Sequence, residues 1–440
     1  MKSRFFLYKS AVVASLAGFL FGFDTVVISG AEQKIQELWG LSSALHGWAI
    51  SMALWGTVLG ALTGGWPSEK YGRKKTLLWI GVLYLSSAIG SALAPEVYSF
   101  MIFRFIGGLG VGISTVAAPM YISEIAPPQY RGRLTGMFQF NIVFGILIAF
   151  LSNSLLGGIS ENDWRWMLAV EALPALVFAL ACFGLPESPR WLIVHKNDHQ
   201  GGEAILRKVN PDYTEQEMQN LVSDIEATRQ EKKQGGPFFS QIHRKPILLA
   251  FLVAFFNQLS GINAILYFAP RIFEMSGLGK EAALLQSVGI GITNLIFTFA
   301  GLWLIDRLGR RMLLYIGSFG YIASLGLTSW AFQTEHFAIV PIAIFAFIAA
   351  HAIGQGAVIW VFISEIFPNR LRASGQSLGS FTHWFFAAAL TLVFPAMAET
   401  LKPQVIFGIF CGMMVLQLIW VKFFVPETKG ISLEDMENRI

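Results

Sequence analysis

Long apolar runs separated by short polar connections dominate the pattern of this chain. Each run is close to the roughly 20 residues that a helix needs to cross the hydrocarbon core of a bilayer. The pattern predicts an all-α membrane protein with 12 transmembrane helices in two six-helix bundles. The runs lie at about 10–31, 45–66, 75–94, 98–122, 132–156, 164–185, 246–274, 283–305, 311–331, 338–364, 371–397 and 403–425.

A longer polar segment divides these runs into two sets of six. It is rich in Glu, Gln, Lys and Arg, and it contains two short amphipathic stretches, Gly202–Val209 and Thr214–Gln230. Stretches of this kind are typical of helices that lie in water. We predict a first bundle over 1–185, a cytoplasmic helical linker over 186–245, a second bundle over 246–425 and a cytoplasmic tail over 426–440.

Composition agrees with a polytopic membrane protein rather than with soluble domains. Of the 440 residues, 54% are hydrophobic and only 14% are charged. The net charge of +4 does not indicate a nucleic-acid partner, because the basic residues sit in short loops between apolar runs. The two cysteines, Cys182 and Cys411, both fall inside apolar runs, so the sequence offers no disulfide or zinc framework. We expect no metal and no cofactor.

The first run imitates a signal peptide, because Lys2, Arg4 and Lys9 precede it. It is too long for a typical signal sequence, however, and it contains Asp24. We interpret it as the first retained span.

The distribution of Lys and Arg predicts the orientation. With the N-terminus inside, the inward segments hold 26 of the 32 basic residues. Both termini are therefore expected in the cytoplasm. We expect the protein in the plasma membrane, which in a bacterium is the inner membrane.

Three motifs recur at nearly one offset. The loop Glu69–Lys74 is repeated at Asp306–Arg311, 237 positions later. The spacing from Glu124 to Arg131 is repeated from Glu365 to Arg372, and Pro186-Glu187 is repeated at Pro426-Glu427. This coincidence indicates that the two halves arose by duplication.

Polar residues are concentrated in the seventh run, at Asn257-Gln258-Leu259-Ser260-Gly261-Ile262-Asn263. Such residues at membrane depth either bond neighbouring helices or face a ligand or a water-filled cavity. Four of them around a glycine favour a site for a neutral polar ligand. On a straight helix Gln258 and Asn263 would lie about 140° apart, so we expect the helix to bend or unwind near Gly261.

These motifs resemble a known family along the whole chain. The two acidic–basic loops resemble the signature of the major facilitator superfamily. Pro186–Leu192, Gln258–Asn263 and Pro426–Gly430 resemble its sugar porter branch, which includes proton–xylose symporters and glucose facilitators. The resemblance implies a sugar site between two bundles near the midplane of the bilayer.

The resemblance also implies sugar-contacting residues. Amide groups suit sugar hydroxyls because they both donate and accept hydrogen bonds, and an indole adds an apolar face and one N–H. Asn257 stands where many relatives have Gln, His383 stands where they have Gln or Asn, and Ile146 replaces a Gln of xylose-type relatives. His383 is expected to act as a neutral hydrogen-bonding group or as a pH-sensitive one. The expected sugar-site residues are Phe21, Gln139, Asn257, Gln258, Asn263, Asn294, Trp360, His383 and Trp384.

Two charged residues lie inside spans, Asp24 in the first and Arg104 in the fourth. One interpretation is a buried ion pair that only fixes helix packing. The other is a proton switch, because a carboxylate beside a guanidinium stays ionised and takes up a proton when the two separate. The resemblance favours the switch, since proton-coupled relatives keep Asp at this position.

The cytoplasmic motifs resemble an ion-pair gate that clamps the halves when the site faces outward. Single surface pairs are weak, about 0–1 kcal/mol, but the duplicated spacing favours a latch with two states. The expected gate residues are Glu69, Arg73, Glu124, Arg131, Glu187, Asp306, Arg310, Glu365, Arg372 and Glu427.

One motif is misleading. Gly107–Gly112 resembles a phosphate loop, but no strand precedes it and the Lys-Ser/Thr of such a loop is missing. The spacing of Gly108 and Gly112 instead predicts close helix packing.

The leading hypothesis is a transporter that imports a monosaccharide with a proton. An uncoupled sugar facilitator is the nearest alternative and a sugar sensor a weaker one. An enzyme is not indicated, because no catalytic constellation is present. The expected partners are a monosaccharide, a proton and the lipid bilayer, with no nucleic acid, and we expect the protein to function as a monomer.

Overall fold

The computed structural model describes residues 2–231, 238–368 and 371–431. Within them, 12 helices are long and apolar enough to cross a membrane, which confirms the predicted number of spans. Large apolar side chains such as Leu93 and Leu155 are about 70% exposed on the helix surfaces, where lipid solvates them. The chain is therefore a multi-pass membrane protein.

The first six spans form one bundle. They comprise α1 (Lys2–Leu38), α2 (Ser43–Thr63), α4 (Arg73–Leu93), α5 (Val97–Ile125), α6 (Pro128–Leu156) and the pair α7 (Asp163–Ala169) and α8 (Ala172–Phe183), with the short α3 (Gly65–Tyr71) after α2. Glycines allow close approach: a Cβ on Gly108 or Gly112 of α5 would collide with the backbone of α2. The predicted helix packing at these two residues is confirmed.

Short helices follow the first bundle and form the connection to the second. They are α9 (Pro189–Trp191), the π-turn η1 (Leu192–Lys196), α10 (His199–Val209) and α11 (Glu215–Glu231), with the 3₁₀ turn η2 (Gln241–His243) before the seventh span. Apolar residues of η1, α10 and α11, among them Ile193, Leu206 and Met218, form a small core of their own. The predicted amphipathic stretches are thus helical. The exact boundaries of the four predicted units remain a prediction.

The last six spans form the second bundle. They comprise the broken helix α12 (Arg244–Leu259), α13 (Ile262–Tyr267) and α14 (Ala269–Met275), then α15 (Lys280–Leu308), α16 (Arg310–Gln333), η3 (Phe337–Ile339), the pair α17 (Val340–Ile353) and α18 (Gln355–Glu365), α19 (Arg372–Thr400) and α20 (Pro403–Phe424). The break at Gly354 (φ −85°, ψ −101°) divides the tenth span and was not predicted.

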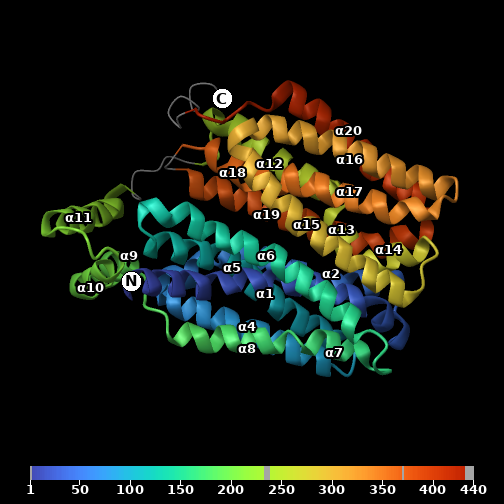
Figure 1. The fold of residues 1–440 in the computed structure, drawn as a ribbon, viewed down its shortest axis with the longest axis horizontal. Coiled ribbons are helices and arrows are strands. Elements are labelled where there is room, and N and C mark those ends of the chain that lie inside the picture. The colour runs from blue at the N-terminus through green and yellow to red at the C-terminus, as the bar shows by residue number, and fades with distance from the viewer. Residues whose placement is uncertain (1, 232–237, 369–370, 432–440) are drawn as a thin grey trace.

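The two bundles lie side by side, blue to green below and yellow to red above in Figure 1. Helix α2 packs on α19, α6 on α15, and α1 on α13 and α14. The N-terminus and α9–α11 lie at one end of the bundles, which we call the termini face. The loop between α7 and α6 and the helix α14 lie at the other end, the opposite face.

Candidate functional site

The predicted break in the seventh span occurs at Gly261. Its φ of 86° lies in the left-handed region that favours glycine, and the Ser260 hydroxyl donates to the Asn257 carbonyl at 2.7 Å. Helix α12 ends at Leu259 and α13 begins at Ile262. As a result Asn263 Nδ2 donates to Gln258 Oε1 at 2.6 Å. The break thus brings together two side chains that a straight helix would hold apart.

Gln258 is the centre of a buried polar cluster. Its Nε2 donates to Asn257 Oδ1 at 2.9 Å and lies 3.2 Å from both ring nitrogens of His383. Gln258, Asn257 and Asn263 are at most 6% exposed. Donors and acceptors of this cluster already satisfy one another, so a bound molecule must offer hydroxyls able to replace those bonds.

Aromatic rings line the same region. The centroid of the His383 ring lies 5.2 Å from that of Trp360 and 4.7 Å from that of Trp384. The Trp384 ring in turn meets Phe21 of α1 edge-to-face at 5.5 Å. Trp360 and His383 are half-buried, while Trp384 is 4% exposed. The cluster therefore reaches from α12 and α19 of the second bundle to α1 of the first.

Gln139 and Asn294 make no hydrogen bond to this cluster in the described part of the chain. Asn294 Oδ1 accepts from Thr298 within α15 at 3.4 Å. Gln139 of α6 is half-buried, and its side chain makes no hydrogen bond to another residue that the structure describes. Their helices, α6 and α15, pack together across the interface of the bundles. Ile146, also on α6, is buried in the apolar core. The part of Gln139 and Asn294 in the site remains a prediction.

Asp24 and Arg104 form a buried ion pair between α1 and α5. Arg104 Nη1 donates to Asp24 Oδ1 at 2.6 Å, and its Nη2 donates to the Asp24 carbonyl at 3.2 Å. Both residues are 1% exposed, and Arg104 Nε has no partner among the described residues. The predicted contact is confirmed, and its part in proton coupling stays a prediction.

A second carboxyl group lies beside this pair. Glu171, between α7 and α8, is 2% exposed and faces both Asp24 and Arg104. One of its oxygens, Oε1, has no hydrogen-bond partner in the described part of the chain. Two carboxyl groups therefore share one guanidinium as their counter-charge. The sequence interpretation missed Glu171, although a lone acid inside the sixth span is the same signal that identified Asp24.

The polar cluster and the ion pair are linked through α1. Phe21, which contacts Trp384, precedes Asp24 by one helical turn. Tyr267 of α13, which is 1% exposed, lies near enough to Arg104 and Asp24 to interact with their charges. A displacement of Trp384 or α13 would therefore act directly on the environment of Asp24.

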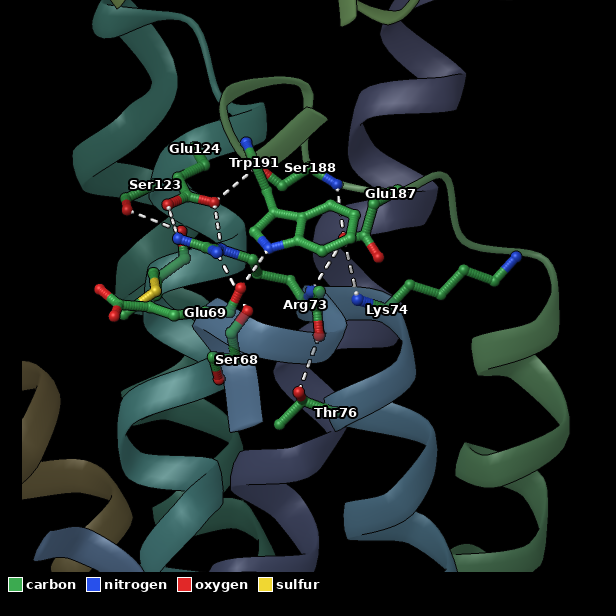
Figure 2. Close-up of polar contacts among 12 residues, drawn as sticks. Ser68, Glu69, Arg73, Lys74, Thr76, Ser123, Glu124, Glu187, Ser188 and Trp191 are labelled. Atoms are coloured by element: carbon green, nitrogen blue, oxygen red, sulfur yellow. Dashed lines mark hydrogen bonds and ion pairs between the residues drawn. The ribbon is translucent and has the colours of Figure 1, made fainter. Parts of the chain in front are cut away.

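At the termini face, Arg73 organises a network within the first bundle (Figure 2). Its Nε and Nη2 donate to the two oxygens of Glu124 at 2.8 and 2.7 Å, as a two-pronged fork. Its backbone N–H donates to Glu187 Oε1 at 2.8 Å. Ser188 donates to Glu124 at 2.5 Å, and Trp191 Nε1 donates to the Glu69 carbonyl at 2.7 Å.

The second bundle repeats the bonds between the arginine, the two glutamates and the hydroxyl of this network, but among the described residues it does not repeat the bond from Trp191. Arg310 Nε and Nη2 donate to the two oxygens of Glu365 at 2.9 and 2.7 Å, and the Arg310 backbone N–H donates to Glu427 at 2.9 Å. Thr428 stands in for Ser188 and donates to Glu365 at 2.6 Å. Asp306 adds only a weak contact to Arg310 at 3.5 Å. The duplication predicted from the sequence is thus visible in the side-chain bonding.

Arg131 and Arg372 are the gate residues that these networks leave out. Neither takes part in an ion pair among the described residues, and each has a buried Nε without a hydrogen-bond partner. Burial and the nearby Arg131 guanidinium lower the pKa of Arg190. In this conformation the networks fasten loops within each bundle rather than one bundle to the other. Clamping of the halves in another conformation remains a prediction.

A family model described as "Sugar (and other) transporter" matches residues 10–439. The chain belongs to the sugar transporter family. Among curated relatives it is 34% identical to the arabinose-proton symporter of Bacillus subtilis, over 98% of this chain and 95% of that protein. It is 32% identical to the D-xylose-proton symporter of Escherichia coli, with the same coverage of both chains.

The solved structures agree with this family assignment. The xylose transporter of E. coli in its inward open conformation superposes with a TM-score of 0.87 at 31% identity, covering 98% of this chain and 99% of that one. The same transporter bound to 6-bromo-6-deoxy-D-glucose gives a TM-score of 0.82 at 32% identity, covering both chains completely. The sugar porter resemblance and the major facilitator fold predicted from the sequence are confirmed.

Proposed function

We propose that this sugar transporter imports a monosaccharide, a pentose or a hexose, together with a proton by alternating access. The observation that carries the proposal is the link through α1 between the Gln258 cluster and the Asp24–Arg104 ion pair. The curated relatives named above are sugar–proton symporters. A transporter with this site is favoured over an enzyme, because every polar group in it suits binding rather than bond cleavage.

The sugar site is assigned to the amide and aromatic cluster. Gln258, Asn263 and Asn257 offer donors and acceptors to hydroxyls, and Trp360 and Trp384 offer apolar faces to the ring carbons. His383 replaces one amide and acts as a hydrogen-bonding group. Because unpaired polar groups are costly in a dry site, the cluster selects sugars by the positions of their hydroxyls. We place Gln139, Asn294 and Phe21 at its edge.

The proton site is assigned to Asp24, with Arg104 as its counter-charge and Glu171 as the neighbouring acid. Ionised Asp24 holds α1 to α5 through the 2.6 Å bond to Arg104. A proton on the carboxyl group removes that attraction and frees α1 to move relative to α5. Since Phe21 on α1 contacts Trp384, sugar binding and the proton act on the same helix.

The conformation is assigned as inward-facing. The structure closely resembles an inward open relative, and the ion pair that joins the two bundles in the described residues lies at the opposite face. The bias of Lys and Arg supports a cytoplasmic location for the termini face. We propose a bacterial inner membrane protein, with both termini cytoplasmic, that works as a monomer.

The proposal is tested by Asp24→Asn in proteoliposomes. One proton that moves inward across 100 mV releases about 2.3 kcal/mol, which supports roughly fifty-fold accumulation of a neutral sugar. We expect the variant to lose accumulation while retaining exchange of labelled for unlabelled sugar. The assay uses a panel of labelled pentoses and hexoses, so that it first identifies a transported sugar.

Asp163→Asn is the matched control. Asp163 is a buried acid at the start of α7 that accepts from the Gly158 N–H at 2.9 Å and lies outside the ion pair. It should leave accumulation intact. Undiminished accumulation by Asp24→Asn, or sugar uptake by the unmodified protein without co-movement of protons, would favour an uncoupled facilitator.

A further inference from the structure

A second buried ion pair lies at the opposite face, where α1 meets α14. Arg271 Nε donates to Glu32 Oε1 at 2.8 Å, and its Nη2 donates to Glu32 Oε2 at 2.7 Å. This is the planar two-pronged geometry that makes Arg–carboxylate pairs strong and directional. The Glu32 side chain is fully buried and that of Arg271 is 23% exposed. The pair is therefore shielded from most of the screening that weakens surface ion pairs.

His46 of α2 completes the arrangement from the first bundle. Its Nε2 lies 2.7 Å from Glu32 Oε2, and both side chains are fully buried. The ring meets Phe268 edge-to-face at 6.4 Å, and its Nδ1 has no partner in the described residues. A further bond holds the guanidinium, because Arg271 Nη2 also donates to Gln36 Oε1 at 2.7 Å. Glu32 is thus held in place on one side while Arg271 meets it from the other bundle.

The positions of the two partners make this pair a contact between the duplicated halves. Glu32 and Arg271 are 239 residues apart, the same interval that separates Gly22 from Gly261. Equivalent positions of the two halves therefore face each other across the interface. Among the described residues this is the single ion pair that joins the bundles. Two further inter-bundle contacts join Gln33 of α1 to Glu274 of α14 at 3.2 Å, and Ser43 of α2 to Glu399 of α19.

We infer that Glu32 and Arg271 form the extracellular gate of the transporter, with His46 as the residue that positions the Glu32 carboxylate. The assignment of this face as extracellular rests on the proposed function. Opening toward the outside has to separate α14 from α1, which breaks the fork and exposes both charges to water. The strength of the pair therefore sets how much of the protein faces outward, an equilibrium between two states.

The gate is tested by measuring distances between the bundles. Spin labels are attached at two exposed positions beside the gate, Glu37 on α1 and Lys280 on α15, in a chain whose Cys182 and Cys411 are replaced by Ala. A second label pair, at Arg133 and Ser374, reports the termini face. Pulsed electron paramagnetic resonance then gives the populations of short and long distances. No sugar and no proton gradient are needed, so the result is interpretable even if the proposed transport activity fails.

Glu32→Gln keeps the shape of the side chain and removes its charge. We expect the ratio of long to short distances at the opposite face to rise at least tenfold, with a matching shift to shorter distances at the termini face. Glu399→Gln, which alters an exposed contact between the same bundles, is the control and should change the ratio less than twofold.

Two further variants address the pairing and the positioning role. Exchanging the partners, Glu32→Arg with Arg271→Glu, should return the ratio to within threefold of the unmodified protein, since His46 can present an acceptor nitrogen in its other tautomer. His46→Gln keeps a donor at similar reach and should preserve the short distance, whereas His46→Ala should raise the ratio. The inference is overturned if Glu32→Gln leaves both distance distributions unchanged, or if the exchanged pair is no better than Arg271→Glu alone.

Discussion

The first helix of each half carries equivalent glycines, but the two helices differ in shape and in charge. Helix α1 runs without a break through Gly22, where a Cβ would collide with the Ile142 carbonyl of α6. The corresponding Gly261 has a φ of 86° and breaks the seventh span into α12 and α13. Two residues later, α1 carries Asp24 where α13 carries Asn263.

The difference indicates how duplicated halves divide one task. The continuous helix holds a carboxylate in an ion pair, and the broken helix turns its amides toward a neutral ligand. At the termini face, by contrast, Arg73 and Arg310 retain the same bonds in both halves. The loops that shape the fold have stayed alike, while the mid-membrane centres have diverged into one charged and one uncharged site.

A substitution of Arg104 gives the strongest test of the charged centre, which consists of Asp24, Arg104 and Glu171. Arg104→Met leaves two buried carboxyl groups without a counter-charge, and we expect the unfolding free energy in detergent to fall by about 3–5 kcal/mol. At the equivalent position of the second half, offset by the 241 residues that separate Glu124 from Glu365, stands the uncharged Phe345. Phe345→Leu removes no charge and should cost less than about 1.5 kcal/mol. Titration with denaturant, followed by far-UV circular dichroism, measures both.

The double variant Asp24→Asn with Arg104→Met separates the contribution of the ion pair to stability from the effect of lost side-chain packing. It removes the charge on Asp24 that Arg104 compensates, so it should recover part of the stability lost in Arg104→Met. Equal losses in the single and double variants would mean that the ion pair is not the source of the difference between the halves.

The conserved bonding at the termini face predicts equal effects in the two halves. Arg73→Gln and Arg310→Gln each remove a fork to a partly buried glutamate, so each should cost about 2 kcal/mol. The cost at Arg310 should be slightly smaller, because Glu365 is 26% exposed against 13% for Glu124. Unfolding of the two variants under one condition gives the comparison. A loss at one Arg and none at the other would show that the two networks are not equivalent.

Sequence patterns predicted most of this architecture because each pattern reflects a local requirement. A span needs an uninterrupted apolar run, and a bend between Gln258 and Asn263 needs a glycine, which Gly261 supplies. The contact of Asp24 with Arg104 was predictable because two lone charges inside a membrane need each other. Glu171 carried the same local signal and could have been found in the same way.

Other features depend on how the halves meet and had no local signal. Glu32 lies near the end of its span and Arg271 beyond the predicted break, where charged residues usually face water. Their pairing arises from the relative position of α1 and α14 in this conformation. The break at Gly354 was also missed, because a single glycine in an apolar run is compatible with a straight helix. Contacts that depend on conformation cannot be read from hydrophobic spacing.

Two equivalent tyrosines give the smallest test of the comparison. Tyr84 of α4 and Tyr321 of α16 are 237 residues apart, the offset of Arg73 and Arg310, and both are fully buried. The Tyr321 hydroxyl lies 2.6 Å from His351 Nδ1. The Tyr84 hydroxyl, beside the Asp24–Arg104 pair, has no hydrogen-bond partner among the described residues.

Removing each hydroxyl should therefore have unequal effects. Tyr321→Phe leaves the His351 nitrogen buried without a partner and should cost about 1–2 kcal/mol of unfolding free energy. Tyr84→Phe removes a hydroxyl that is already unsatisfied and should be neutral or slightly stabilising. Thermal unfolding of the two variants side by side measures the difference. A larger loss at Tyr84 would mean that its hydroxyl bonds Asp24 or Glu171 in a state other than this one, and the charged centre would then extend to α4.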